Sequence, residues 1–197
     1  MANVLVVKGH PFDETKSTTV QLLKTFMERY TQTHPDDHIE IVDVFADDIP
    51  CVDADLLTAF ANPETLTEEQ QHKLQQFNKY TEQFLNSDKI IIANPMWNLH
   101  IPAPLKSWID TIVVARKTFK YTPEGPVGLA MGKKVMHLQS SGSSFNGNDP
   151  ITHYLDAVFN YIGIDNIEHI YIDGHHSSDT SQIEKAEKEA LVKAENF

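Results

Sequence analysis

Lys89-Ile90-Ile91-Ile92-Ala93 decides the fold of this chain. A short continuous run of β-branched residues, without polar alternation, is typical of a central parallel strand that is covered on both faces. On either side of this run, strand-like and helix-like periodicities alternate along the sequence. We therefore predict an α/β architecture in which crossover helices connect the strands of a parallel sheet.

The other expected elements follow from the same periodicities. Four further strands are expected at residues 3–8, 39–44, 134–139 and 168–172. Helices are expected at residues 17–29, 67–86, 102–112, 151–162 and 181–194, and the segment up to Leu66 is expected to be irregular. Alternation in 117–121, followed by Pro123-Glu124-Gly125-Pro126, predicts a small surface hairpin. No internal repeat or linker is visible, so we predict a single doubly wound domain over residues 1–197, with strand order 2-1-3-4-5.

Composition and charge restrict the classes of partner. The chain has 197 residues, 41% of them hydrophobic, which is ordinary for a globular protein. Its net charge of −12 repels nucleic-acid backbones and anionic lipid surfaces, so neither is an expected partner. A phosphate group would have to be bound locally, by backbone N–H groups, hydroxyls and a helix N-terminus.

The N-terminal sequence and the cysteine content bear on the cellular compartment. Cys51 is the only cysteine, so an internal disulfide and a Cys-x-x-Cys pair are both impossible, and we expect it to be half-buried. Residues 1–8 have no basic region or cleavage site and read as a strand. No apolar run approaches the roughly 20 residues of a membrane helix. We therefore expect a cytoplasmic protein.

Three loops are the candidate binding segments. In an open parallel sheet, ligands bind beyond the carboxyl ends of the strands, near the point where the strand order reverses. The loops after the first, third and fourth strands should converge there. They cover residues 9–19, 94–100 and 140–147.

Each loop offers a different kind of contact. Ser17-Thr18-Thr19 stand at a helix N-terminus that suits a phosphate. The alternative is that one of the three residues only caps the helix and the other two are solvated. Met96-Trp97-Asn98 can form an apolar wall with amide donors against a flat heterocycle, with core packing as the alternative. The segment 140–144 is small and uncharged, which favours close backbone approach but also fits a plain flexible loop.

Several familiar sites are excluded by spacing. The glycines fit neither the G-x-G-x-x-G nor the P-loop pattern, and no G-x-S-x-G elbow is present. Cys51 has Thr58 rather than arginine seven positions on, which excludes the phosphate loop of low-molecular-weight tyrosine phosphatases. A late cluster of histidines and carboxylates reads as a solvated loop, so we predict no metal site; it comprises Asp173, His175, His176 and Asp179.

Three longer motifs resemble one enzyme family. They are Ile92-Ala93-Asn94-Pro95-Met96-Trp97-Asn98-Leu99 followed by Ile101-Pro102-Ala103-Pro104-Leu105-Lys106, then residues 117–129 from Lys117-Thr118-Phe119 to Gly128-Leu129, and Gly132-Lys133-Lys134. With these motifs the chain resembles, over nearly its whole length, the FMN-dependent NADH-azoreductases. These flavodoxin-like homodimers are also described as NADH:quinone oxidoreductases.

The resemblance implies a cofactor, a reaction and a set of binding residues. FMN would be bound by Ser17, Thr18, Thr19, Met96, Trp97, Asn98, Leu99, Ser140, Ser141, Gly142 and Ser143. A hydride would pass from NADH or NADPH to the flavin, and then to a quinone or aromatic azo compound in a ping-pong sequence, with no catalytic side chain required. Phe119, Tyr121 and Tyr161 would line the substrate slot from the partner subunit of a homodimer, or else serve packing.

Two departures from the family pattern leave alternatives open. Ser141 and Ser143 stand where the family usually has Arg and Gly. His10 stands where small residues are common, and we expect its side chain either to contact a phosphate or to cap its loop. A one-electron carrier of the flavodoxin type is the alternative function, and a non-catalytic binding module a third. The expected hairpin argues against a simple carrier, because it is suited to covering a site or a partner.

Overall fold

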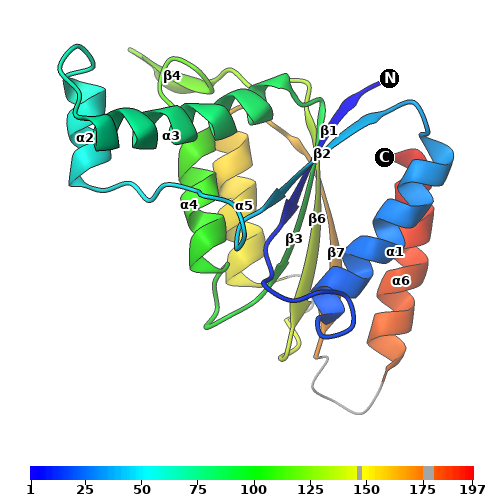
Figure 1. Cartoon of the computed structure of the whole chain (residues 1–197). Helices are drawn as coiled ribbons and strands as arrows, with labels where there is room; N and C mark the ends of the chain where they lie inside the picture. The colour runs from blue at the N-terminus through cyan, green and yellow to red at the C-terminus, as the bar shows by residue number, and fades with distance from the viewer. Residues whose placement is uncertain (146–147, 175–179) are drawn as a thin grey trace.

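Five parallel strands form the central sheet (Figure 1). The structure is a computed structural model and describes residues 1–145, 148–174 and 180–197. The strands are β1 (Asn3–Lys8), β2 (His38–Asp43), β3 (Lys89–Pro95), β6 (Lys134–Ser141) and β7 (Asn166–Asp173). Their order is β2-β1-β3-β6-β7, which is the predicted 2-1-3-4-5 when only the strands of this sheet are counted. The strand order reverses between β1 and β3, as in other doubly wound sheets.

Helices cover both faces of the sheet. Figure 1 shows α1 (Thr18–Thr33) and α6 (Ser181–Asn196) together on one face. The other face carries α3 (Glu68–Asn86), α4 (Ala103–Ile112) and α5 (Pro150–Tyr161). Each face has its own hydrophobic core, and β3 contributes Ile90 and Ile92 to one core and Ile91 and Ala93 to the other. This two-sided burial explains why the sequence of β3 does not alternate.

One helix was not expected from the sequence. Within the segment predicted to be irregular up to Leu66, the chain forms α2 (Ala54–Ala61), which packs on the outer side of α3. Asp53 caps α2 by accepting the Leu56 N–H at 2.9 Å, and Phe60 packs edge-on against Phe77. The prediction of an irregular segment was wrong because α2 has only eight residues and its N-cap, Asp53, closely follows the turn residues Asp47, Asp48 and Pro50.

The predicted surface hairpin is present as a separate two-stranded sheet. Its strands are β4 (Phe119–Thr122) and β5 (Gly125–Gly128), which pair antiparallel. Gly128 lies directly against the turn after α5, where an added Cβ would stand 2.2 Å from the Gly163 nitrogen. Only glycine allows this contact, so the hairpin is held at a fixed place against α5.

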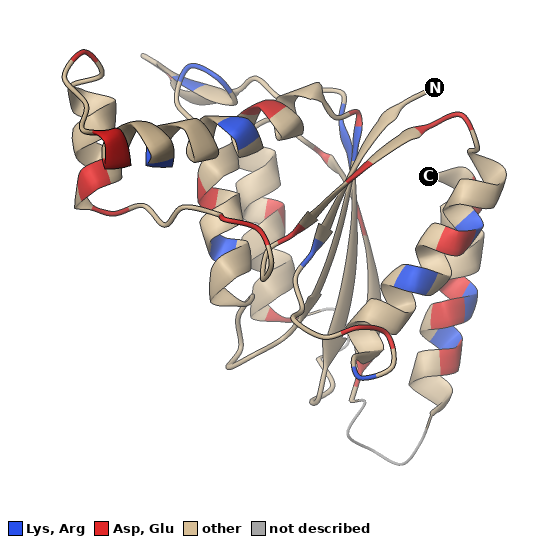
Figure 2. Ribbon diagram, in the orientation of Figure 1, with Lys and Arg blue, Asp and Glu red and all other residues tan. Residues whose placement is uncertain are grey.

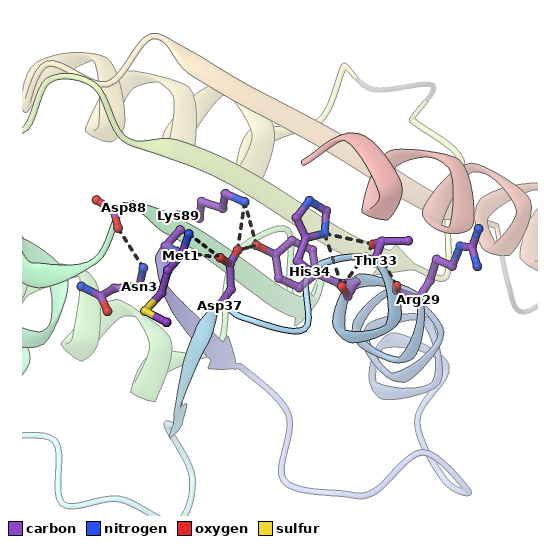
Figure 3. Close-up of polar contacts among 10 residues, drawn as sticks. Met1, Asn3, Arg29, Thr33, His34, Asp37, Asp88 and Lys89 are labelled. Carbon is purple, nitrogen blue, oxygen red and sulfur yellow. Dashed lines mark hydrogen bonds and ion pairs between the residues drawn. The ribbon is translucent and has the colours of Figure 1, made fainter.

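Ionic and polar groups join several segments at the edge of the sheet opposite the carboxyl ends of the strands. Figure 3 shows Asp37 between the first residues of the chain and Lys89. Its carboxylate accepts hydrogen bonds from the Ala2 N–H, the Tyr30 hydroxyl and the Lys89 ammonium. Figure 2 shows acidic residues along the helices and in the connecting loops, consistent with the net charge of −12. Among the described residues, no helix is long and apolar enough to cross a membrane.

Candidate functional site

A cavity of about 180 Å³ opens at the carboxyl edge of the sheet, where the three predicted loops meet. The loops after β1, β3 and β6 all contribute to it, as the rule for open parallel sheets predicts. Its lining consists of His10, Lys16, Ser17, Thr18, Thr19, Pro95, Met96, Trp97, Ser140 and Gly142. Most of these residues are uncharged, and Lys16 brings the one ordinary cation among them.

The N-terminus of α1 forms one wall of the cavity. Ser17 is the N-cap, and its hydroxyl oxygen accepts the Val20 N–H at 3.3 Å, which leaves its O–H free to donate outward. The Thr19 hydroxyl forms a 2.6 Å hydrogen bond with the Ser140 hydroxyl and so joins α1 to β6. The N–H groups of Thr18 and Thr19 belong to the first turn, where no helical acceptor exists. This wall therefore combines capping with a set of donors suited to an anion.

A tight turn after β3 forms the second wall. Trp97 and His100 exchange two backbone hydrogen bonds of 3.0 Å each, and the residues between them, Asn98 and Leu99, have φ angles of 51° and 64°. Two consecutive left-handed residues define a type I′ turn. Trp97 keeps 42% and Leu99 58% of their surface exposed, so neither is explained by core packing. The Met96 N–H donates to the Ser140 carbonyl at 2.8 Å and fixes this turn next to β6.

The third loop begins later than predicted. Ser140 and Ser141, expected in the loop, are the last residues of β6, because parallel pairing with β7 continues to Asp173. The Ser141 hydroxyl lies 2.6 Å from the Ser143 carbonyl and 2.9 Å from Asp173 Oδ1, while Asp173 Oδ2 accepts the Phe145 N–H at 3.1 Å. Asp173 thus anchors this loop to the end of β7.

Four of the predicted binding residues do not line the cavity. Asn98 and Leu99 are the central residues of the turn, Ser141 is buried, and Ser143 is exposed. The other predicted residues of the three loops are brought together in its lining. Pro95 and Lys16 also line the cavity and were not among the predicted binding residues. The sequence does carry a signal for Lys16, because this lysine directly precedes the N-cap Ser17 and so places a cation next to the helix N-terminus.

His10 also lines the cavity, and the structure shows it capping its own loop. Its Nδ1 accepts the Phe12 N–H at 3.1 Å, and its ring meets the Trp97 ring edge-on with centroids 5.6 Å apart. Burial lowers the pKa of His10, and the nearby Lys8 lowers it further. A neutral His10 whose Nδ1 accepts carries its proton on Nε2, so it remains a donor.

The three aromatic residues of the predicted slot form one cluster away from this cavity. The Phe119 ring lies 4.7 Å from that of Tyr161 and 5.3 Å from that of Tyr121, measured between centroids. Phe119 is buried, whereas Tyr121 is 74% exposed. Tyr121 also borders a larger, mostly apolar cavity of about 800 Å³, together with Val52, Phe60 and Arg116.

The remaining candidate reactive groups are the late histidine and carboxylate cluster and Cys51. Among the described residues, no three His, Cys, Asp or Glu side chains are arranged to hold a metal ion. Of the four residues considered for a metal, Asp173 is described, and His175, His176 and Asp179 lie outside the described residues. Cys51 was expected to be half-buried but is exposed, with its sulfur 3.3 Å from the Ser107 hydroxyl.

Comparison with known proteins identifies the family. The family model for the flavodoxin-like fold matches residues 2–194. The chain is 46% identical over 200 residues to an FMN-dependent NADH:quinone oxidoreductase of Streptococcus suis (strain 98HAH33), covering all of this chain and 98% of the relative. A protein of the same name from Staphylococcus carnosus (strain TM300) is 36% identical over 206 residues, with 100% of this chain and 98% of the relative covered.

A solved structure agrees with these relatives. It is an FMN-dependent NADH-azoreductase from Bacillus anthracis str. Ames Ancestor in complex with FMN, 31% identical, with 100% of this chain and 99% of that chain covered and a TM-score of 0.94. The resemblance seen in the sequence motifs is thereby confirmed over the whole length. The chain belongs to the flavodoxin-like family, in the group of FMN-dependent NADH:quinone oxidoreductases and NADH-azoreductases.

Proposed function

We propose that the protein is an FMN-dependent NADH:quinone oxidoreductase that also reduces aromatic azo compounds. The observation that carries this proposal is the meeting of the loops after β1, β3 and β6 around one cavity with mostly uncharged donors. A cavity of about 180 Å³ suits the phosphate and chain of FMN rather than its three-ring system, since pockets that enclose such ligands measure roughly 300–1,000 Å³. The rings would therefore extend over the exposed Trp97 and Leu99.

The donors at α1 suit the phosphate end of FMN. Lys16, Ser17, Thr18 and Thr19 all line the same cavity, so the free N–H groups of the first turn, a hydroxyl and an ammonium are available there, and the helix dipole adds to their effect. These local groups offset the repulsion expected from a net charge of −12. The Ser140–Ser143 segment and the Met96–Leu99 segment would contact the ring system from two sides.

FMN, when bound, supplies the redox chemistry by accepting a hydride from NADH or NADPH and passing two electrons to the quinone or azo acceptor. The residues of the chain bind and orient the reactants. Trp97 and Leu99 offer an apolar surface on which flat rings stack, and His10, being neutral, adds a donor without adding charge. No side chain has to act as a catalytic acid or base.

We further propose that the active unit is a homodimer in which Phe119, Tyr121 and Tyr161 complete the site of the partner subunit. In one subunit these residues lie outside the cavity lining, yet Tyr121 is 74% exposed and the hairpin is fixed by Gly128. An exposed aromatic residue on a rigid support is suited to an interface. Each chain would act as a single flavin-binding domain over residues 1–197, in the cytoplasm, where a lone free cysteine stays reduced.

Anaerobic titration of the purified protein tests the proposed activity. We expect the protein to bind FMN and become yellow, and NADH alone to bleach the colour, which a quinone or azo dye then restores. Bleaching that needs a separate reductase would favour the alternative, a one-electron carrier of the flavodoxin type. A protein that stays colourless after incubation with FMN would contradict both.

A further inference from the structure

Four side chains form a hydrogen-bonded series across the sheet, from the surface of α5 to the end of β3. Asp156 Oδ1 of α5 lies 3.0 Å from His169 Nε2 of β7. His169 Nδ1 lies 3.0 Å from His137 Nδ1 of β6, and His137 Nε2 lies 3.0 Å from Asn94 Oδ1 of β3. Asn94 and His137 are fully buried, whereas the Asp156 side chain is 40% exposed. We call this series the Asp156–Asn94 chain.

The amide of Asn94 fixes the direction of the first bond. Asn94 Nδ2 donates to the Pro95 carbonyl at 3.1 Å, so the carbonyl oxygen of the amide faces His137. The opposite orientation would place two oxygens together. Asn94 Oδ1 can only accept, and His137 Nε2 must therefore carry a proton.

His137 then fixes the protonation of His169. Burial, and then the neighbouring His169, lower the pKa of His137 to about 3, so His137 is neutral at pH 7 and its Nδ1 has no proton. His169 Nδ1 must donate to it. His169 Nε2 faces the carboxylate of Asp156, which also only accepts. Both ring nitrogens of His169 therefore have to carry protons.

We propose that His169 is an imidazolium, held between Asp156 and His137, and that these residues are positioning residues for the flavin-binding turn. Through His137 they fix the Asn94 amide, and Asn94 fixes the Pro95 carbonyl, directly before Met96 and Trp97. This role rests on the proposed function, because the turn after β3 is taken as part of the FMN site. A buried network whose members all have partners restricts its backbone to one arrangement.

The groups around His169 fit a cation at this position. Tyr171 stacks on it, with ring planes 4° apart and centroids 5.7 Å apart, and burial raises the pKa of Tyr171 to about 12, which keeps it neutral. Asp149, at the N-terminus of α5, adds a negative charge near His137, the residue next to His169 in this series. On β7 and α6, Glu168 and Lys193 pair with each other at 3.3 Å, and Lys193 donates to the His169 carbonyl.

The protonation states can be measured without flavin. Two-bond ¹H–¹⁵N NMR spectra of the FMN-free protein at pH 7 report each ring nitrogen separately. We expect both nitrogens of His169 to be protonated and His137 to carry its proton on Nε2 only. In Asp156→Asn, the new amide can donate to Nε2, so His169 should become neutral while the His137 tautomer is unchanged. The control Asp165→Asn removes an exposed carboxylate from the turn before β7 and should change neither.

A neutral His169 in the wild-type protein, or His137 protonated on Nδ1, would overturn the proposed protonation. Because this measurement uses protein without FMN, its result does not depend on whether the proposed function is correct.

The positioning role is tested by two variants of one residue. His137→Gln keeps a donor near the position of Nε2, whereas His137→Leu leaves Asn94 Oδ1 unsatisfied. FMN affinity, followed by flavin fluorescence, should stay within about twofold of wild type in His137→Gln and weaken about tenfold in His137→Leu, equivalent to about 1.4 kcal/mol. The Asn94 side-chain amide and Met96 N–H resonances should move in the Leu variant only.

Equal FMN affinity in the two variants, whether unchanged or weakened, would overturn the positioning role, because the hydrogen-bond donor would then make no difference. Thermal unfolding of both FMN-free proteins shows that each variant is folded at the temperature of the binding measurement. A wild-type protein that shows the expected protonation states and binds no FMN would contradict the proposed function and leave the Asp156–Asn94 chain standing.

Discussion

The carboxylate of Asp37 shows how much one residue can contribute at the edge of the sheet away from the cavity. Its side chain is 8% exposed and contacts groups from the first residues of the chain, from α1 and from β3. Burial alone would raise the pKa of Asp37, but hydrogen bonds from Tyr30, Ala2 and Lys89 lower it to about 2. The folded protein therefore favours the ionised form.

Asp37→Asn should lower the free energy of unfolding by about 3 kcal/mol at pH 7, because it leaves the mostly buried ammonium of Lys89 without its counter-ion. Urea unfolding measures this. Since the pKa is lowered from 3.8 to about 2 on folding, the contribution is complete well above 3.8 and is lost as the pH falls toward 2. The difference between variant and wild type should shrink over that range.

The neighbouring carboxylate provides the control for this prediction. Asp36 is exposed, and Asp36→Asn removes the same charge from the same loop. It should change the free energy of unfolding by less than about 0.5 kcal/mol. Similar losses in the two variants would mean that net charge, rather than the contacts of Asp37, is responsible.

Among the elements, the turn after β3 carries strain that its packing does not explain. Leu99 has a φ of 64° and is 58% exposed, so burial within the chain does not compensate for its left-handed conformation. Such a conformation costs a leucine roughly 1–2 kcal/mol, whereas asparagine adopts it readily. Strained residues of this kind tend to be retained where a ligand or partner uses them.

Leu99→Asn should therefore raise the free energy of unfolding of the FMN-free protein by about 1 kcal/mol. It should also weaken FMN binding, because an apolar contact surface is lost. The control is Leu57→Asn in α2, where the leucine is 57% exposed but helical, and where asparagine should lower stability by about 0.5 kcal/mol. Urea unfolding of both variants gives the two signs. A loss of stability in Leu99→Asn would remove the evidence for strain.

Elements with strong local signals were predictable from the sequence. The uninterrupted β-branched run predicts β3, and the expected helix at residues 67–86 begins at a Thr-x-x-Gln pattern, Thr67 to Gln70, which forms a capping box in the structure. The strand order followed from the alternation of strands and helices. The helix α2 was missed because only eight residues separate Asp53 from Asn62, too few to show a clear period.

The candidate site was predictable as a group of loops but not as a set of contacts. The position of a loop follows from the topology, whereas the Thr19–Ser140 hydrogen bond joins residues 121 positions apart. The pairing of His137 with His169 depends on the register of β6 and β7, which no local pattern encodes. Contacts of this kind become visible only once the strands are aligned.

At the scale of the whole molecule, the separation of the two candidate surfaces bears on the proposed homodimer. The cavity proposed to bind FMN lies at the carboxyl edge of the sheet, while the aromatic cluster of Phe119, Tyr121 and Tyr161 lies on β4 and α5, outside its lining. On the proposed function, one subunit would thus offer both parts of a site without joining them. If two copies pair about a two-fold axis, each part meets its complement twice.

Mixing two inactive variants tests this arrangement. Thr18→Glu places a carboxylate where the FMN phosphate is expected and should abolish FMN binding. Tyr121→Ala should keep FMN but lower acceptor reduction about tenfold or more, with Val192→Ala on α6, 62% exposed, as an unaffected control. The wild type and both variants should sediment at twice the chain mass of 22.3 kDa.

If the sites are shared, a heterodimer of the two variants has one site with both defects and one site with neither. After the subunits are mixed in equal amounts, unfolded and refolded together with FMN, half of the dimers should be heterodimers. Quinone reductase activity should then rise to about a quarter of the wild-type value, although each variant alone is nearly inactive. Sites contained within one chain cannot complement each other, since every subunit keeps its own defect. Activity that stays at the average of the two variants would therefore show that Tyr121 acts within its own chain.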